Sequence, residues 1–283
     1  LLVTFIGEEI KGSKRWLDFP ILPRFQPIEL VKPLFVLIVA KIIVSNDKMN
    51  IYNRYLLSFF ILSLVVALLI NQPDIGQTLL LISTWITMVF ASGFNMIILS
   101  ILGLVVLVAI VFLIYFFPSK FGYIPLRIQT FFNPKTGDNF QSQKALDAIK
   151  QGGLTGQGMG EGILKDQVPE AHTDYIIAVI SEEFGALFVL LIVILFLFIG
   201  YKIFSKVLLE GDEFIKLSLI GLTTLLIIQT FIHIGVNVKL LPTTGMTLPF
   251  LSYGGSSLIG TSIIAGIILN FTRKDFTRYI KNE

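Results

Sequence analysis

Residues 168–174 bring together the groups of this chain that could do chemistry. Within five residues the segment holds two carboxylates (Glu170 and Asp174), one of the chain's two histidines (His172) and the hydroxyl of Thr173. A carboxylate beside a water-accessible vestibule can take the proton of a hydroxyl nucleophile. We therefore expect Asp174 to be a catalytic base. The structural alternative is that Asp174 only caps the helix that it begins, where the helix dipole favours an acid.

The composition is that of an integral membrane protein. Of the 283 residues 54% are hydrophobic and 14% are charged, and the mean hydropathy is +0.81. A soluble domain carries about 25% charged residues. The absence of cysteine excludes disulfides, thiolate nucleophiles and cysteine metal sites. The net charge of +3 gives no reason to expect a nucleic-acid partner.

Seven apolar segments, each near the ~20 residues that cross a bilayer, predict an all-α polytopic helix bundle. They are 28–44, 55–70, 78–91, 96–117, 174–201, 214–236 and 256–271, and residues 1–6 read as the end of a further span. Pro73 and Gly76, between the second and third segments, predict a kink or a tight turn. With the basic C-terminal tail in the cytoplasm, the segment count places residues 118–174 outside.

The domain prediction is a single transmembrane domain over 1–283, with residues 118–174 as a large extracytoplasmic loop. We expect this loop to be ordered and functional, with an amphipathic helix over 140–150 and a glycine-rich run over 152–162. The run matches no nucleotide-binding pattern.

Ionisable groups inside predicted spans are functional candidates by default, although each could instead face a water-filled cavity or reach the interface. Glu29 and Lys32 are three residues apart and share one helix face. Glu182 and Glu183 point about 100° apart, so we expect at most one of them to face any given site. His233 is expected to hydrogen-bond to a neighbouring helix.

The segment 239–253 is rich in Pro, Gly, Thr and Ser, and its hydroxyls and free amides can line a polar cavity or bind an anionic headgroup. A plain re-entrant turn is the alternative. Thr243 and Ser252 are its candidate contacts.

The strings PEAHTD and YIIAVISEEFG resemble the SEDS (shape, elongation, division and sporulation) family. KGSKRW with FQPIELVK, QPDIGQT and LPTTGMTLPFLSYGGSS resemble it as well, so the likeness covers essentially the whole chain. The segment 127–162 is more similar to the division branch than to the elongation branch. The resemblance implies a bundle of about ten helices with both termini in the cytoplasm. This chain would then begin at the end of the third helix and lack those before it.

The resemblance also implies a peptidoglycan glycosyltransferase that polymerises lipid II at the division septum of the bacterial cytoplasmic membrane. A sugar hydroxyl of one lipid-linked disaccharide attacks the anomeric carbon of another, and undecaprenyl diphosphate leaves. The essential carboxylate of the family's HTD motif falls on Asp174. Arg15 and Trp16 match a loop pair of the family, Lys32 its intramembrane lysine, and Asp74 and Glu183 two further acids whose roles are structural or supporting.

The leaving diphosphate needs positive charge or a divalent cation such as Mg²⁺ or Mn²⁺. Arg15, Lys32 and Lys239 are the cations nearest by motif, and whether a metal is used is left open. The residues expected to bind substrate are Arg15, Trp16, Glu29, Lys32, His172, Thr173, Lys239, Thr243 and Ser252.

The implied partners are a cognate class B penicillin-binding protein, other division proteins and membrane lipid. The competing hypotheses are a lipid II flippase, a polymerase of cell elongation and a scaffold that only recruits a transpeptidase. Loss of the Asp174 carboxylate separates them, because a flippase or a scaffold would tolerate it.

Overall fold

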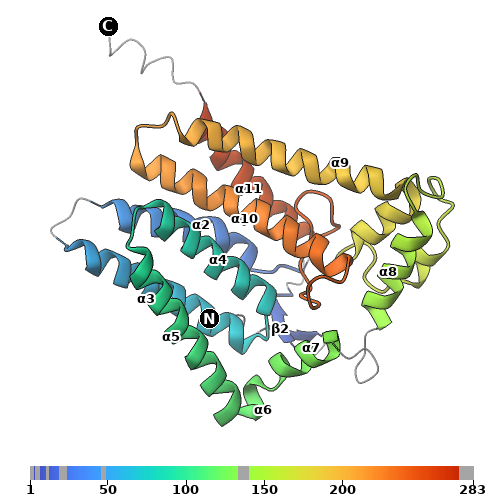
Figure 1. Ribbon diagram of the computed structural model, residues 1–283, viewed down its shortest axis with the longest axis horizontal. Helices are drawn as coiled ribbons and strands as arrows, with labels where there is room; N and C mark the ends of the chain where they lie inside the picture. The colour runs from blue at the N-terminus through green and yellow to red at the C-terminus, as the bar shows by residue number, and fades with distance from the viewer. Residues whose placement is uncertain are drawn as a thin grey trace, which may run out of the picture.

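The computed structural model describes residues 3, 7–10, 13–18, 24–45, 49–132 and 140–273 (Figure 1). Of the sequence features above, all but one residue of the predicted stub over 1–6, residues 133–139 of the long loop and the basic C-terminal tail from residue 274 lie outside these ranges. The elements are β1 (Glu8–Ile10), β2 (Ser13–Trp16), α2 (Ile28–Val44), α3 (Ile51–Asn71), α4 (Ile75–Ala91), α5 (Met96–Phe116), α6 (Pro118–Phe121), α7 (Tyr123–Phe132), α8 (Phe140–Gly152), the 3₁₀ turn η1 (Leu164–Gln167), α9 (Ile176–Val207), α10 (Glu213–Asn237) and α11 (Gly255–Thr272).

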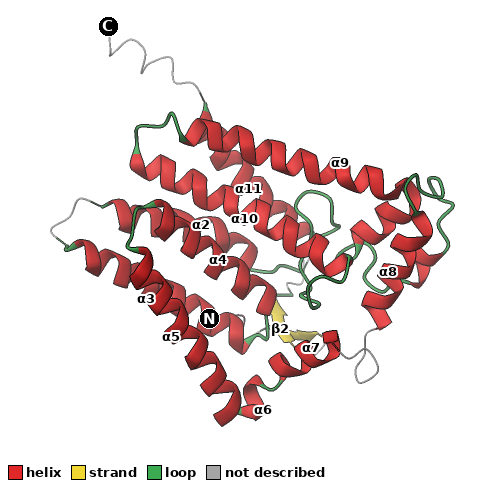
Figure 2. Cartoon of the chain, in the orientation of Figure 1, coloured by secondary structure: helices red, strands yellow, loops and turns green. Residues whose placement is uncertain are grey.

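The expected all-helical membrane fold is confirmed, with a two-stranded hairpin of β1 and β2 as its only described sheet (Figure 2). Seven hydrophobic helices lie where the seven spans were predicted. Within the described residues, α3, α9, α10 and α11 are long and apolar enough to cross a bilayer. The helices α2 and α4 have 17 residues each. The chain is therefore a multi-pass membrane protein.

Helix α10 lies at the centre of the bundle and contacts α2, α4, α8, α9 and α11 (Figure 1). A small residue allows this approach, because a Cβ atom at Gly221 would lie 2.6 Å from the Val36 side chain and 2.7 Å from the sulfur of Met88. Small residues at such contacts let helix backbones come close together inside a membrane. The centre of the bundle is thus held by close packing of α10 on α2 and α4.

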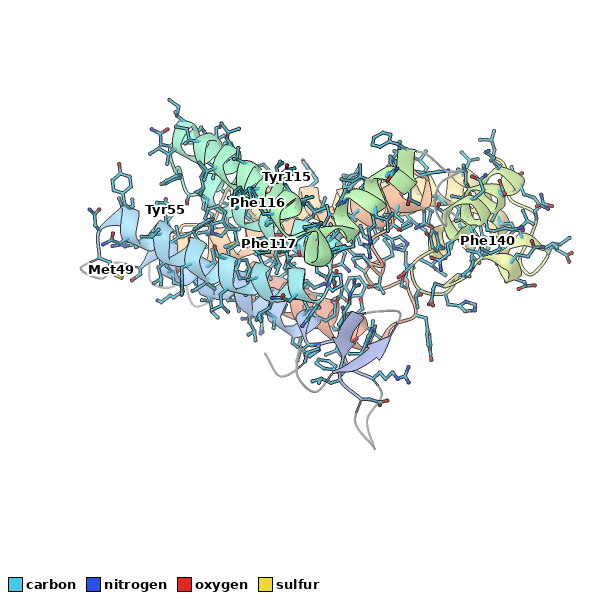
Figure 3. All side chains as sticks on the ribbon, turned by 90° about the horizontal axis from the view of Figure 1, so that it is seen from below. Met49, Tyr55, Tyr115, Phe116, Phe117 and Phe140 are labelled. Carbon is cyan, nitrogen blue, oxygen red and sulfur yellow. The ribbon has the colours of Figure 1, made fainter. Side chains whose placement is uncertain are left out.

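Helix α5 stands at the edge of the bundle and carries exposed aromatic side chains at its C-terminal end. These side chains are Tyr115, Phe116 and Phe117 (Figure 3). In the same view Met49 and Phe140 lie at opposite ends of the molecule. Exposed aromatic residues at the end of an apolar helix are typical of the membrane–water interface. This part of the surface is suited to lipid.

Helix α9 is broken at Gly185, whose backbone is not helical (φ 81°, ψ 172°). The glycine-rich segment after α8 fills the break. The N–H groups of Gln157 and Gly158 donate to the carbonyls of Glu182 and Glu183, at 2.9 and 3.0 Å. Such a segment satisfies backbone groups that a kinked helix leaves without partners.

Glu182 and Glu183 fasten the same stretch of loop to α9. The Oε1 atom of Glu182 accepts the N–H of Leu164 at 2.8 Å, and Glu183 accepts the N–H of Gly160 and pairs with Lys165. Each acid binds a different part of the loop, so the expectation that at most one of them faces a given site is not contradicted. The loop runs around the kinked helix, so it can reach both faces.

The predicted turn between the second and third spans is confirmed at residues 72–74. Gly76, which was expected to belong to it, lies in the first turn of α4. A Cβ atom on it would lie 2.7 Å from the sulfur of Met246 and 2.9 Å from Thr244. This glycine permits close packing and does not break the helix. The short helices α6 and α7 and the hairpin were not predicted, whereas the predicted helix over 140–150 is confirmed as α8.

The glycine contacts at the break in α9 predict a difference between two substitutions. Gly156 and Gly160 have similar backbones (φ +82° and +85°), which cost a non-glycine residue about 1–2 kcal/mol. A Cβ atom at Gly156 would lie 2.2 Å from the Glu183 carbonyl, whereas nothing lies within 4 Å at Gly160. We expect Gly156→Ala to lower the thermal unfolding midpoint in detergent more than Gly160→Ala. Equal shifts would contradict the proposed docking of the loop on α9.

Candidate active site

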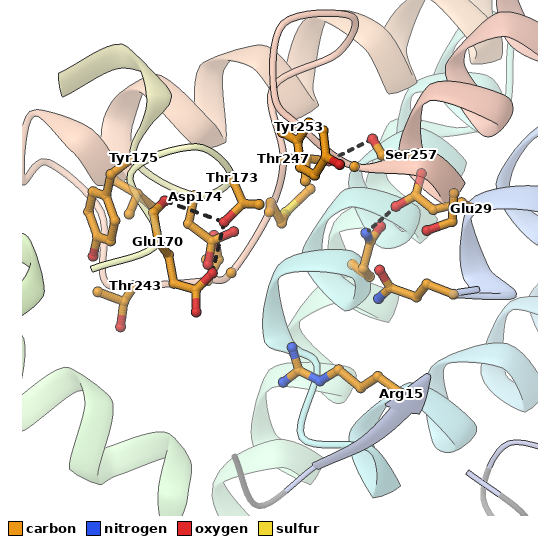
Figure 4. Close-up of a pocket in the computed structure, with 18 of the residues that line it drawn as sticks. Arg15, Glu29, Glu170, Thr173, Asp174, Tyr175, Thr243, Thr247, Tyr253 and Ser257 are labelled. Carbon is orange, nitrogen blue, oxygen red and sulfur yellow. Dashed lines mark hydrogen bonds between the residues drawn. The ribbon is translucent and has the colours of Figure 1, made fainter. Parts of the chain in front are cut away.

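A polar cavity of about 430 Å³ opens at the end of the bundle where α9 begins and α10 ends (Figure 4). Its walls come from segments far apart in the sequence: the hairpin, the start of α4, helix α7, residues 170–175 and the loop 243–257. Of the predicted site residues, it is lined by Arg15, Trp16, Glu29, Thr173, Asp174 and Thr243. Parts of the chain that the sequence analysis had linked only through motifs therefore meet at one place.

Asp174 and Arg15 face each other across Gly245. The Oδ2 atom of Asp174 and the Nη1 atom of Arg15 lie 3.5 and 3.8 Å from where a Cβ atom would stand on Gly245. Figure 4 shows the two side chains on opposite walls of the cavity. A glycine here keeps the space between acid and guanidinium open for a substrate.

Asp174 was expected to begin a helix, but it does not. Helix α9 starts at Ile176, and its N-cap residue is Tyr175, which makes no side-chain cap hydrogen bond. Asp174 is one residue outside the cap, so the capping alternative does not explain it.

Thr173 and Glu170 stand beside Asp174 in the cavity wall. The hydroxyl of Thr173 donates to the Glu170 carboxylate at 3.1 Å, a contact drawn in Figure 4. Glu170 has a left-handed backbone (φ 57°). The neighbouring His172 instead lines a second cavity of about 600 Å³, together with Lys165 and Tyr253. Glu170 was noted in the sequence as a carboxylate but was not assigned to the site.

Arg15 is held in place by the turn before α4. Its Nε atom donates to the carbonyl of Gln72 at 3.0 Å, its Nη2 donates to the carbonyl of Pro73, and its Nη1 lies 3.6 Å from Asp74. Asp74 is also the N-cap of α4 and accepts the N–H of Gln77 at 3.2 Å. Burial raises the pKa of the Asp74 carboxyl, and the charge of Arg15 partly offsets this effect. Asp74 thus contacts both Arg15 and the first turn of α4, which is the arrangement that its predicted supporting role would need.

Arg127, on α7, is one of three arginines in the cavity wall, together with Arg15 and Arg24. It donates to the Thr243 carbonyl at 3.2 Å. Burial lowers the pKa of Arg127, and the like charge of Arg15 lowers it further. A guanidinium nevertheless stays protonated at neutral pH. Arg15 and Arg127 repel each other in this cavity, so the cavity attracts an anion. This role of Arg127 had not been predicted from the sequence.

Lys32 lies behind the cavity and is fully buried. Its ammonium is 2.7 Å from Glu29 and donates to Gln229 at 3.0 Å. Glu29 does line the cavity and also accepts from the side chain of Gln77 at 3.0 Å. The structure therefore gives Lys32 protein partners on α2 and α10, with no place in the cavity wall.

Two other predicted contacts lie outside the cavity. Lys239 borders a different pocket and donates to Gln143 at 3.3 Å. The hydroxyl of Ser252 donates to the carbonyl of Thr173 at 2.7 Å and accepts the N–H of Leu248 at 2.8 Å. Ser252 therefore contacts the backbone of the segment that carries Asp174.

His233 was expected to hydrogen-bond to a neighbouring helix, but it hydrogen-bonds to a loop. Its Nδ1 atom lies 2.7 Å from the carbonyl of Met246. The loop after α10 is thereby tied back to the same helix.

The described residues contain no group of three or more acidic, histidine or cysteine side chains placed to hold a metal ion. Mg²⁺ needs fewer protein ligands when a substrate brings phosphates, since one or two carboxylates then suffice. Asp174 and Glu170 line the same cavity and meet that requirement. The donor set is compatible with a cation that arrives with a diphosphate.

The buried pair of Lys32 and Glu29 predicts a non-additive effect on stability. Lys32→Met leaves the Glu29 carboxylate buried without its cation, which costs about 3–5 kcal/mol. The double variant Lys32→Met/Glu29→Gln removes both charges and should be more stable than the single variant. Denaturation of the detergent-solubilised proteins measures this, and a double variant no more stable than the single one would show that the pair is not coupled.

Comparison with known proteins identifies the family. Residues 1–276 match the model of the family described as "Cell cycle protein", which covers FtsW, RodA and SpoVE. Proteins named "Probable peptidoglycan glycosyltransferase FtsW" are 37% identical in Caulobacter vibrioides and 38% in Geobacter metallireducens. These alignments cover 97% of this chain, and 69% and 74% of those proteins.

Solved structures share the fold. A chain of a peptidoglycan synthase complex, described as coordinating polymerization and crosslinking, matches with a TM-score of 0.78 and 29% identity, over 97% of this chain and 77% of that one. The rod shape determining protein RodA of Thermus thermophilus matches with a TM-score of 0.67 and 26% identity, over 97% and 74%. The chain therefore belongs to the SEDS family of cell cycle proteins, and the curated relatives named here are of the FtsW type.

Proposed function

We propose that this protein is a peptidoglycan glycosyltransferase that polymerises lipid II into glycan strands. The observation that carries the proposal is the carboxylate of Asp174 facing the Arg15 guanidinium across an open glycine in a polar cavity at one end of a membrane bundle. A base on one wall and cations on the other suit a reaction in which a hydroxyl attacks and a diphosphate leaves. Relatives at 34–38% identity carry the same enzyme name.

The chemical step assigns a role to each wall of the cavity. Asp174 takes the proton of the acceptor sugar hydroxyl as its oxygen bonds to the anomeric carbon of the donor. The bond from that carbon to the diphosphate oxygen breaks, and undecaprenyl diphosphate leaves with the electron pair. Arg15 and Arg127 bind the negative charge that develops on the diphosphate. Fixed cations at this position act without reorganising during the reaction.

A divalent cation that arrived with the diphosphate would be held by Glu170, which lines the same cavity, while Asp174 keeps its role as the base. When bound, the cation would supply charge neutralisation to the leaving group.

The cell-biological setting that fits this activity is the division septum of the bacterial cytoplasmic membrane. A glycan polymerase needs a transpeptidase to crosslink its product, so a class B penicillin-binding protein is the expected partner, with other division proteins around it. The matching synthase complex, which joins polymerization and crosslinking, supports this arrangement. The apolar surface of α5 remains available to membrane lipid.

The decisive substitution is Asp174→Ala. It removes the base but leaves Arg15 and Arg127, so lipid II should still bind while glycan synthesis falls to background. The assay is polymerisation of lipid II by the intact protein with its transpeptidase partner and a divalent cation, with binding measured separately. Asp147→Ala, which changes a half-buried acid on α8 outside the cavity, is the matched control and should retain activity.

The same pair of variants tests the alternative functions. A flippase would move lipid II across reconstituted vesicles equally well with Asp174→Ala. Equal glycan product from wild type and Asp174→Ala would remove Asp174 from the mechanism.

Arg127 and Lys239 give a second test, because both line the neighbouring pocket but only Arg127 also lines the cavity. Arg127→Ala removes a charged hydrogen-bond donor from the cavity, which is worth about 1.5–3 kcal/mol, so kcat/KM for lipid II should fall about 10- to 100-fold. Lys239→Ala should change kcat/KM little, because Lys239 lies outside the cavity. A larger loss from Lys239→Ala than from Arg127→Ala would place the diphosphate elsewhere.

A further inference from the structure

Three consecutive carbonyls at the base-bearing segment are each held by a hydrogen bond, two from the loop between α10 and α11 and one from the last residue of α10. The carbonyl of His172 accepts the N–H of Tyr253 at 2.8 Å. The carbonyl of Thr173 accepts the hydroxyl of Ser252 at 2.7 Å. The carbonyl of Asp174 accepts the side-chain amide of Asn237 at 3.0 Å. The backbone that carries the base is therefore fixed from outside its own helix.

Asn237 is the buried centre of this arrangement. It is the last residue of α10 and has no exposed surface. Its Nδ2 atom donates to the carbonyls of Asp174 and His233, and its Oδ1 accepts the N–H of Ala178 at 3.2 Å. Two neighbours are carbonyls and one is an N–H, so the chemistry fixes which way the amide points. One side chain joins α10, the base and the first turn of α9.

The loop that supplies Ser252 and Tyr253 is itself attached to α10. The amide of Gln229 donates to the Thr247 carbonyl at 2.9 Å, and the ring of His233 bonds to Met246. Helix α9 gives less support of its own, because it starts without a side-chain cap and Asp174 lies before its N-cap. The position of Asp174 relative to Arg15 thus depends on α10 more than on the helix that follows it.

We propose that Asn237 and Ser252 are positioning residues that hold the Asp174 carboxylate at its working distance from the substrate hydroxyl. They act through the backbone and do not touch substrate, since neither lines the cavity. The inference rests on the proposed function, because it is that reaction for which Asp174 must be positioned. A displacement of about 1 Å in a catalytic group can cost about 100-fold in rate.

The experiment compares Asn237→Leu and Ser252→Ala with two controls in the intact protein and its transpeptidase partner. Asn237→Leu keeps the approximate volume and removes the amide. Ser252→Thr keeps the hydroxyl and should behave as wild type. Thr230→Val removes another buried hydrogen bond of α10, the one from Thr230 to the Leu226 carbonyl. Thr230 lies about two helical turns before Asn237. The readouts are kcat and KM for lipid II, and hydrogen exchange of the peptide over 168–180 by mass spectrometry.

We expect Asn237→Leu and Ser252→Ala to lower kcat by about 100-fold, with KM changed less than about twofold. Amide exchange over 172–178 should become faster in both. Thr230→Val should change neither readout, even if it lowers thermal stability. Unchanged exchange, or faster exchange with wild-type kcat, would overturn the inference. A higher KM with unchanged kcat in Ser252→Ala would also overturn it, since Ser252 would then be a substrate contact.

Failure of the proposed function would be seen in other arms of the same experiment. An inactive wild type, or equal product from wild type and Asp174→Ala, would overturn the polymerase and the positioning role together. An active wild type and an inactive Asp174→Ala, with Asn237→Leu as fast as wild type, would overturn the positioning role alone.

Discussion

The structure depends on a stripe of polar side chains on the central helix α10. Gln229, His233 and Asn237 are four residues apart, so they lie on one face of the helix, and all three are buried. In a membrane bundle a buried polar group is costly unless it is paired. Each of the three reaches out of the helix to a segment that has no regular structure: Thr247, Met246 and Asp174. The cost of burying this stripe is thus offset by ordering the loops that form the site.

The charges of the cavity are arranged on top of that framework. Asp74 and two backbone carbonyls hold Arg15, which fixes its position but uses much of its hydrogen-bonding capacity. Among the described residues, Arg127 donates to the Thr243 carbonyl. Because each guanidinium raises the electrostatic cost of the other, an incoming anion relieves both. The Asp174 carboxylate and the Arg15 guanidinium both border the space that Gly245 leaves open, so they can act on different atoms of one substrate placed there.

Sequence reasoning predicted the class of fold, and it singled out Asp174, which lies in the cavity wall, because both features have strong local signals. Apolar runs of the right length predict spanning helices, and the short segment around Asp174 concentrates carboxylates at a boundary of polarity. It did not predict that α7 brings Arg127 into the cavity, or that Lys32 and Lys239 stay out of it. These side-chain placements depend on the rotation of each helix about its own axis and on the path of a long loop, and no local sequence pattern specifies either. Asn237 did have a usable signal: polar residues at 229, 233 and 237 share one face of an apolar helix.

The buried ion pair on α2 belongs to the same framework, which changes how its importance for activity is to be understood. Lys32 donates to Gln229 Oε1, and the Nε2 of Gln229 donates to the Thr247 carbonyl. Thr247 in turn bonds to Ser257 at the start of α11. A continuous path therefore leads from the charged pair to the loop that contains Gly245. A substitution at Lys32 can reach the cavity through that path without any contact between the lysine and the substrate. An activity loss at Lys32 alone would not make it a diphosphate ligand, whereas a loss at Arg127, which lines the cavity, has the direct explanation.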